Sequence, residues 1–257
     1  SIIHTPLLDT KNLCVSIGKK TVLENISISL FANEWLMVCG PNGAGKSTLI
    51  NAITDAIPFN GKISLYNKAS NTYTPKEKAK KIAVLTQQNP SSYDFTVREI
   101  VHLGRYAWQD SFFDIASKND EKAINTALEQ CGIIDMQHRA TNTLSGGELQ
   151  RVFLAQAFAQ EAEILLLDEP ANHLDLVYQK NIFSLLKKWV KQDNHAILSV
   201  VHDLSIAKNY GTKTLLLDNA QQIAFGKTDA VLTSKNLNSV YGLDVASWMQ
   251  QQLSAWN

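Results

Sequence analysis

The sequence predicts an α/β fold with a mostly parallel sheet, an antiparallel β subdomain and an inserted helical subdomain. Three observations support this prediction. Buried strand-like runs alternate with helical patterns late in the chain, the middle of the chain is mostly helical, and strand pairs near both ends are joined by short turns. Alternation of strands and helices indicates parallel strands joined by crossover helices, and the short turns indicate antiparallel hairpins.

The first 66 residues contain the pattern of a hairpin followed by a strand, a loop and a helix. Strand-like runs at 13–17 and 22–30 flank a Gly-Lys-Lys turn and predict the hairpin. A more apolar run at 34–39 predicts a buried strand, and helical spacing of apolar residues follows Lys46. Another short strand is expected at 62–66.

The remainder of the chain supplies the helical block and the later strands. Helical patterns are expected at 96–103, 120–130, 148–160 and 177–190, and buried strands at 164–167 and 196–201. A terminal hairpin is expected over 214–225, followed by short helices. We therefore expect one domain over residues 1–257, with a helical subdomain at about 88–160 and a C-terminal extension at about 226–257.

Composition excludes several classes of protein. The 257 residues include 24 Lys or Arg and 24 Asp or Glu, so no overall positive field favours nucleic acid as a partner. The basic cluster at 76–81 is better explained as a solvated helix face. The three cysteines are far apart and form no CxxC pair, which predicts a reducing compartment and no structural metal. No apolar run approaches the roughly 18 residues of a membrane span, so we expect any membrane role to come through a partner.

Residues 40–48 carry a phosphate-binding pattern. The segment reads Gly40-Pro41-Asn42-Gly43-Ala44-Gly45-Lys46-Ser47-Thr48 and fits G-x-x-x-x-G-K-S between a predicted strand and a predicted helix. Its glycines allow backbone N–H groups to face phosphates, and the helix start adds positive potential. Lys46 is expected to reach the β- and γ-phosphates, and Ser47 to ligate Mg²⁺. The chain is therefore predicted to be a P-loop nucleoside triphosphatase.

Two carboxylates end a later apolar strand. Leu165 to Leu167 are followed directly by Asp168 and Glu169. Asp168 occupies the place of a Mg²⁺-organising carboxylate in phosphate-loop enzymes. Glu169, one residue further on, is expected to polarise a water molecule for attack on the γ-phosphate.

A further element, Leu144-Ser-Gly-Gly-Glu148, precedes this acidic strand end. With these motifs, the chain from about residue 10 to 245 resembles the ATP-binding-cassette (ABC) family of ATPases. The resemblance implies that two copies of the chain enclose ATP, so that Ser145, Gly146 and Gly147 of one copy contact the γ-phosphate bound by the other. Glu148 stands where Gln is commoner in this family.

The resemblance also implies roles for residues outside these motifs. Asp175 matches the loop that links the two sites across the dimer, and His202 matches a histidine that senses the γ-phosphate. Gln87 matches a glutamine that ligates Mg²⁺ and couples to the membrane partner, with Gln88 as the alternative. Ile17 stands where the family usually has an aromatic residue that stacks on adenine, so the stacking contribution of about 1–3 kcal/mol is absent here.

Two segments, 95–108 and 226–242, are most similar to the ATPases of iron–siderophore, haem and cobalamin importers. The first lies where such cassettes meet the permease, although Tyr106 and Trp108 also suit simple packing. The implied partners are a second copy, integral-membrane permease subunits and, indirectly, an extracytoplasmic substrate-binding protein, at the cytoplasmic face of the inner membrane.

Three other interpretations compete with an importer ATPase. The main alternative is a soluble ABC ATPase that serves protein assembly, such as iron–sulfur cluster assembly. Chromosome-maintenance ATPases of this family carry long coiled coils, and no sustained heptad pattern occurs here. A simple phosphate-loop kinase has no need of the element at 144–148.

Overall fold

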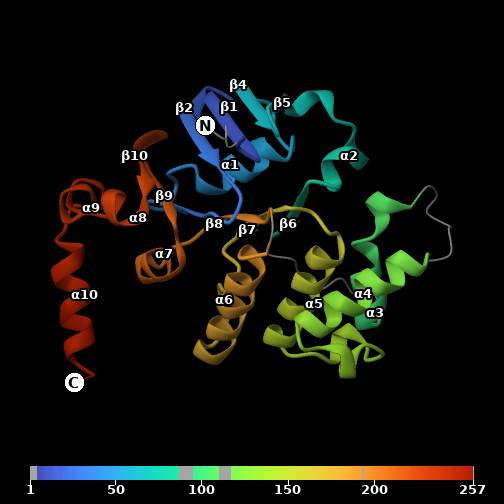
Figure 1. Ribbon diagram of the computed structural model, residues 1–257. Helices are drawn as coiled ribbons and strands as arrows, with labels where there is room; N and C mark the ends of the chain where they lie inside the picture. Colours follow the sequence, from blue (N-terminus) through green and yellow to red (C-terminus); the bar gives the residue numbers. More distant parts are fainter. Residues whose placement is uncertain (1–4, 87–94, 110–116, 193, 257) are drawn as a thin grey trace. The chain divides into compact units, whose positions relative to one another are not determined.

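The computed structural model describes residues 5–86, 95–109, 117–192 and 194–256. These residues form two compact units, which are described separately. The first unit comprises residues 1–68 and 198–257, and the second comprises residues 69–197. The labels of the helices and strands are those of Figure 1.

The first unit contains strands from both ends of the chain, together with most of the C-terminal helices. Its elements are β1 (Leu8–Ile17), β2 (Lys20–Leu30), β3 (Trp35–Cys39), α1 (Lys46–Ile53), β4 (Asn60–Leu65), α7 (Leu204–Tyr210), β9 (Lys213–Asp218), β10 (Gln221–Lys227), α8 (Thr228–Val231), α9 (Ser234–Tyr241) and α10 (Val245–Ser254). The division between the units falls inside two strands, β5 (Lys68–Ala69) and β8 (Ala196–Val200).

The second unit is mainly helical. Its elements are α2 (Pro75–Ala79), β6 (Ile82–Leu85), α3 (Val97–Leu103), a 3₁₀ turn (Tyr106–Trp108), α4 (Lys118–Gln130), α5 (Gly146–Ala159), β7 (Ile164–Asp168) and α6 (Leu176–Val190), with further 3₁₀ turns at Ser70–Thr72, Ile134–Met136 and Thr141–Thr143. Among the described residues, no helix combines the length and apolarity that crossing a membrane requires.

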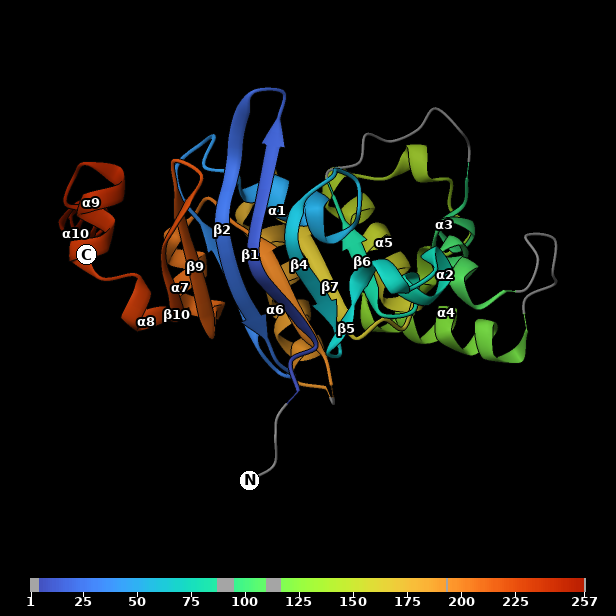
Figure 2. The same cartoon turned by 90° about the horizontal axis from the view of Figure 1, so that it is seen from above.

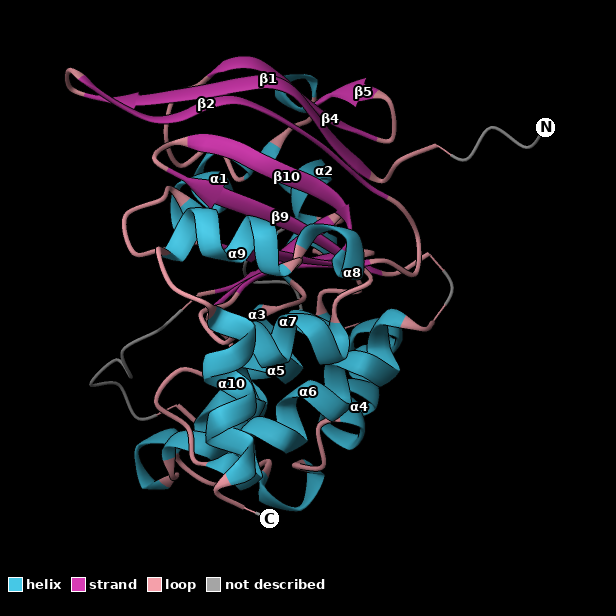
Figure 3. Ribbon diagram, turned by 90° about the vertical axis from the view of Figure 1, so that its left-hand side faces the viewer, coloured by secondary structure: helices cyan, strands magenta, loops and turns pink. Residues whose placement is uncertain are grey.

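The strands of the first unit pair in the order β4-β1-β2-β10-β9-β3. The pairs β1–β2, β1–β4 and β9–β10 are antiparallel, and β3–β9 is parallel. Figures 2 and 3 show β1, β2 and β4 running side by side as one layer. Both predicted hairpins are confirmed. The second turns at Asn219 and Ala220, whose positive φ angles of 46° and 69° suit a tight two-residue turn.

Strand β3 lies in the core of the first unit and carries the phosphate loop at its end. All of its residues, Trp35–Cys39, are buried. The indole N–H of Trp35 donates to the Ser199 hydroxyl at 2.8 Å, and the N–H of Val201 donates to the carbonyl of Val38 at 3.2 Å. A strand covered on both faces is typical of a parallel core and gives the loop a rigid base.

In the second unit, helices α3, α4 and α5 pack on one another (Figure 1). Arg105 connects them from a buried position with 3% of its side chain exposed. Its Nε donates to Asp120 at 2.8 Å, and its Nη1 donates to the carbonyl of Ala159 at 2.7 Å. Burial acts to raise the pKa of Asp120, but the hydrogen bonds from Arg105 and Ser117 outweigh it and hold that pKa below its usual value.

The predicted elements are present, with small differences in their limits. Helix α5 begins at Gly146, two residues earlier than expected, because the preceding serine caps it. The short helix α7 was not predicted. Helix α2 has no buried residue, which agrees with the solvated face expected at 76–81. The parallel pairs β3–β9 and β6–β7 confirm the α/β class. The single-domain limits and the 88–160 subdomain remain predictions.

Candidate active site

The phosphate loop at residues 40–48 leaves β3 and enters α1. Gly40 has a φ of 152°, and a Cβ atom there would lie 2.1 Å from the backbone oxygen of Leu217. Gly45 caps α1 with a φ of 101°, and a Cβ atom there would lie 2.6 Å from the backbone oxygen of Val22. Both positions therefore exclude any side chain, which explains two glycines of the motif.

Lys46 folds back onto the loop that precedes it. Only 6% of this residue is exposed. Its Nζ donates to the carbonyl oxygen of Gly40 and, at 3.4 Å, to that of Pro41. The same Nζ lies 3.4 Å from Nδ1 of His202, a residue 156 positions away in sequence. The structure thus brings together two residues that the sequence analysis assigned to the γ-phosphate.

The loop presents both backbone and side-chain groups to solvent. Asn42, Gly43 and Ser47 are exposed, whereas Ala44 is buried. The N–H of Ala44 donates to the carbonyl of Pro41 at 3.2 Å and closes the loop on itself. An exposed serine in the first turn of a helix, directly after a glycine-rich loop, suits a phosphate group and its counter-ion.

Ile17 and Cys39, two further residues of the first unit, differ in exposure. Ile17 ends β1 and is 59% exposed, so it can contact a ligand, although its predicted position at adenine stays a prediction. Cys39 ends β3 and is fully buried. Burial raises the pKa of the Cys39 thiol to about 12, against a smaller opposing effect of Lys46. Cys39 is therefore a neutral core residue, as expected.

In the second unit, Ser145 begins helix α5 through a reciprocal pair of hydrogen bonds. The hydroxyl of Ser145 accepts from the N–H of Glu148 at 3.2 Å, and the Glu148 carboxylate accepts from the N–H of Ser145 at 2.9 Å. Ser145 and Gly146 are exposed. Gly146, the first residue of this 14-residue helix, is thus exposed, and the positive end of the helix dipole at this point favours an anion.

Gly147 and Asp175 are held by the same neighbouring helix, α6. A Cβ atom at Gly147 would lie 2.2 Å from the ring of Tyr178, so this position also excludes a side chain. Asp175 caps α6 by accepting from the N–H of Tyr178 at 3.0 Å. Tyr178 therefore packs on the Ser-Gly-Gly segment from one side and is fixed by Asp175 on the other.

The acidic strand end contains an unusual backbone conformation. Asp168 and Glu169 follow buried residues of β7 and are both partly exposed. Glu169 has a φ of 54°, a left-handed conformation that is uncommon outside glycine. The side-chain amide of Asn172 donates to the Glu169 carboxylate at 2.8 Å, and the N–H of Asn172 donates to the Glu169 carbonyl at 3.1 Å. Such local strain often occurs at functional positions.

The sequence analysis did not single out Asn172 and Tyr178, and it missed the capping role of Glu148. A signal existed for Glu148, because Ser-x-x-Glu at the start of a helical pattern indicates a capping box. No such signal marks the other two, whose contacts depend on the folded loop after β7.

The predicted site residues therefore lie in both units. The first unit contains the loop 40–48, Ile17 and His202, and the second contains Asp168, Glu169, Asp175 and the segment 145–147. Gln87 and Gln88 lie outside the described residues.

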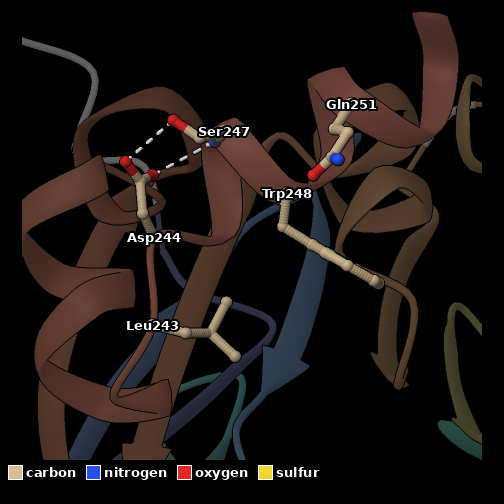
Figure 4. A pocket seen from close by; sticks show the side chains of 5 residues that line it. All are labelled: Leu243, Asp244, Ser247, Trp248 and Gln251. Atoms are coloured by element: carbon tan, nitrogen blue, oxygen red, sulfur yellow. Dashed lines mark hydrogen bonds between the residues drawn. The ribbon is translucent and has the colours of Figure 1, made fainter.

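A pocket at the start of α10 is lined by none of these residues (Figure 4). Its volume is 450 Å³, and it is lined by Leu243, Asp244, Ser247, Trp248 and Gln251. Asp244 caps α10 by accepting from the N–H of Ser247 at 3.1 Å and from its hydroxyl at 2.8 Å.

A comparison with known protein families shows to which family this chain belongs. Residues 23–172 match the family described as ABC transporter. The chain belongs to that family. Its ATP-binding proteins hydrolyse ATP to power transport, and this ABC protein is accordingly an ATP-binding ATPase.

Similar characterised and uncharacterised proteins come from several bacteria. The uncharacterized ABC transporter ATP-binding protein YvrA of Bacillus subtilis is 37% identical over 91% of this chain, which spans 53% of YvrA. The hemin import ATP-binding protein HmuV of Thermobifida fusca is 34% identical, with 94% of this chain and 84% of HmuV covered. The ferric enterobactin transport ATP-binding protein FepC of Escherichia coli is 33% identical, with 91% and 86% covered.

Solved structures show the same fold. A transporter described as of metal-chelate type, in an inward-facing conformation, matches with a TM-score of 0.82 and 28% identity over 93% of this chain and 90% of that one. A dimeric bacterial ABC transporter cassette, MJ0796, matches with a TM-score of 0.74 and 26% identity over 86% of this chain and 98% of that one.

Proposed function

We propose that this ABC protein is the ATP-hydrolysing subunit of an importer for a metal chelate: an iron–siderophore, haem or cobalamin. The observation that carries the ATPase part is that Ser145 and Gly146 are exposed at the N-terminus of α5 in a chain that also has a phosphate loop. Similarity to HmuV and FepC over most of both chains supports the choice of cargo. The alternative, a soluble ATPase of protein assembly, finds no support among these relatives.

In the proposed reaction, two copies of the chain bind two ATP molecules and close on them. The phosphate loop of one copy faces Ser145, Gly146 and Gly147 of the other copy. The N-terminus of α5, exposed at Ser145 and Gly146, offers partial positive charge to the γ-phosphate, and Lys46 leaves its loop carbonyls to neutralise the phosphate oxygens. The dimeric cassette MJ0796 is consistent with this arrangement.

Three side chains are proposed to complete the chemistry. Glu169 accepts a proton from the attacking water, and Asn172 positions its carboxylate. His202 contacts the γ-phosphate, which its distance of 3.4 Å from Lys46 Nζ supports. Asp175 links the two sites across the dimer. Catalysis then consists mainly of positioning and charge neutralisation.

The oxygen donors proposed for magnesium fit that ion chemically. Mg²⁺ prefers hydroxyl, carboxylate and amide oxygens, which Ser47, Asp168 and Gln87 supply. When bound, the ion would neutralise the charge that develops on the phosphate oxygens. The exposed position of Ser47 at the start of α1 supports its assignment.

The permease is proposed to dock beside the 3₁₀ turn Tyr106–Trp108. Tyr106 and Trp108 are 51% and 41% exposed. Lys76 Nζ lies 5.4 Å from the ring centre of Tyr106, and Lys80 Nζ lies 4.8 Å from that of Trp108. Exposed aromatic rings lined with lysines suit a partner segment that is both apolar and acidic. This contact would hold the protein at the cytoplasmic face of the inner membrane, with an extracytoplasmic binding protein on the other side.

The test is an affinity purification of the Glu169→Gln protein with Mg·ATP from detergent-solubilised membranes of the source cell. We expect a polytopic permease to co-purify, and the double variant Glu169→Gln, Trp108→Ala to lose it. Trp108 lies outside the nucleotide motifs, so this control separates docking from ATP binding. Recovery of soluble proteins alone would contradict the importer assignment and leave the ATPase assignment intact.

A further inference from the structure

The segment proposed to contact the γ-phosphate carries a negative charge of its own. Between Arg139 and Arg151, Glu148 is the only charged residue in the sequence. Its Oε2 accepts from the backbone N–H of Ser145 at 2.9 Å, so the carboxylate lies directly beside the serine. In the proposed closed dimer this carboxylate would lie near a γ-phosphate that is also negative, and like charges brought together repel.

Arg139 supplies the opposite charge. Its Nη1 lies 3.9 Å from Oε1, the other carboxylate oxygen of Glu148. Its Nη2 donates to the carbonyl oxygen of Thr143 at 3.3 Å, two residues before Ser145. One guanidinium group therefore contacts this segment both before and after its Ser-Gly-Gly residues, and it brings a positive charge to the carboxylate. The planar, forked shape of arginine suits such a double contact.

The backbone that carries Arg139 is itself anchored. The N–H of Val97, at the start of α3, donates to the Arg139 carbonyl at 3.0 Å, and the N–H of Arg139 donates to the Met136 carbonyl at 3.0 Å. One turn of α3 further on, the N–H of Arg98 donates to the Gln137 carbonyl at 2.8 Å. Because the main chain is fixed, ordering the ion pair costs only side-chain entropy.

The exposure of the pair indicates when it matters. The side chains of Arg139 and Glu148 are 47% and 28% exposed. An ion pair so open to water contributes little to the stability of a single copy. Closure of a dimer over this surface would exclude water, and charges interact more strongly in a drier environment. The pair is therefore expected to act on the closed, nucleotide-bound dimer more than on folding.

We propose that Arg139 is a positioning residue for the closed dimer. It neutralises Glu148 beside the γ-phosphate bound by the other copy and holds the carbonyl of Thr143, so the N-terminus of α5 stays attractive to an anion. The inference rests on the proposed function, since it requires ATP to lie between two copies. It also explains how an acidic residue is accommodated so close to a phosphate.

The test is a double-mutant cycle in the Glu169→Gln protein, where ATP is expected to stay unhydrolysed. Sedimentation velocity at saturating Mg·ATP measures the dimer Kd of this parent, of Arg139→Ala, of Glu148→Gln, and of the combined variant. Arg139→Ala should raise the dimer Kd at least about tenfold, because two unbalanced carboxylates then lie near two phosphates. Glu148→Gln removes the repelling charge and should not weaken the dimer. The combined variant should return to within about threefold of the parent.

The combined variant separates charge balance from a purely structural role. Arg139→Ala loses the contact with Thr143 whichever residue occupies position 148, so a structural defect would persist in the combined variant. Equal weakening by Arg139→Ala with glutamate and with glutamine at position 148 would therefore overturn the proposal. An unchanged dimer Kd in Arg139→Ala would overturn it as well.

Two further variants serve as controls. Lys122→Ala removes the same positive charge from an exposed position on α4 and should dimerise as the parent does. Arg139→Lys keeps the charge without the fork, and its dimer Kd should stay within about threefold of the parent. Weakening by Lys122→Ala as large as that by Arg139→Ala would assign the effect to net charge and contradict the proposal. Equal losses in Arg139→Lys and Arg139→Ala would contradict the charge balance.

Lys46→Ala in the same parent distinguishes this inference from the proposed function. It should stay monomeric with Mg·ATP. A parent that does not dimerise, or a Lys46→Ala variant that does, would overturn the proposed function itself. If Arg139→Ala fails to fold, Arg139→Gln repeats the cycle with the same expected results, because it removes the charge and keeps an amide donor for the Thr143 carbonyl.

Discussion

The two halves of the candidate site are built by different means. In the first unit, the phosphate loop is held by groups far away in sequence, such as the Leu217 carbonyl against Gly40 and His202 beside Lys46. In the second unit, Ser145 and Glu169 are each held by a side chain three residues further on.

This contrast teaches which features of an ATP site are encoded locally. A capping box forms wherever the helix forms, because both partners belong to one turn. A glycine-rich loop takes up its conformation only when the surrounding strands are in place, because those strands occupy the space that a side chain would need. Disturbing one contact of the first half should therefore destabilise that half as a whole. Each substitution in the second half should cause only a small, local loss of stability.

The largest effect is expected where a long-range contact is broken. Gly40→Ala places a Cβ atom 2.1 Å from the Leu217 oxygen in a backbone conformation unfavourable to alanine, and we expect a loss of about 3–5 kcal/mol in unfolding free energy. Urea denaturation measures this. Gly146→Ala is the control, since nothing lies within 4 Å of its Cβ position. Equal stability of the two variants would refute the contrast.

The next effect concerns the chemistry of the second half. Glu169→Gln removes the proposed base and keeps a side chain of the same shape. We expect turnover to fall at least about 10²-fold, equivalent to roughly 2.7 kcal/mol in the barrier, with ATP binding intact. A phosphate-release assay and calorimetry check this pair of results. Near-normal turnover would reassign the base.

Asp120 tests a contact that is both local and long-range. It caps α4 with Ser117 and pairs with Arg105, and these contacts keep the pKa of Asp120 below its usual value. Because the folded pKa is lowered, the stabilisation is complete above the unfolded pKa of about 3.9 and is lost as pH falls through the folded pKa. Asp120→Asn should cost about 2 kcal/mol at pH 7 and less at pH 3. A difference from the wild type that does not change with pH would contradict the assignment.

The smallest effect is expected from a purely local contact. Glu148→Ala removes one side of the capping box and should cost about 1 kcal/mol in thermal or urea unfolding. Glu148→Gln keeps an acceptor in the same place and should be nearly neutral. If Glu148→Ala destabilised the protein as much as Gly40→Ala, the second half would not be locally built.

The same contrast explains how much was predictable from the sequence. The loop at 40–48, the acidic strand end and the strand–helix order were predicted, because each depends on a continuous run of residues. The contact between Lys46 and His202 was not, because it depends on which strands pair side by side. Glu148 was assigned to family variation, although Ser-x-x-Glu already indicated its role in the cap.

The central claim is that the two halves form one site across two copies of the chain. Light scattering of the Glu169→Gln protein tests this directly. Without hydrolysis, the closed dimer with bound ATP should not dissociate. We predict a dimer with Mg·ATP, a monomer without nucleotide, and a monomer with Mg·ATP when either Lys46→Ala or Ser145→Arg is added. A Glu169→Gln protein that stays monomeric at saturating Mg·ATP, or dimerises regardless of Ser145→Arg, would contradict the account.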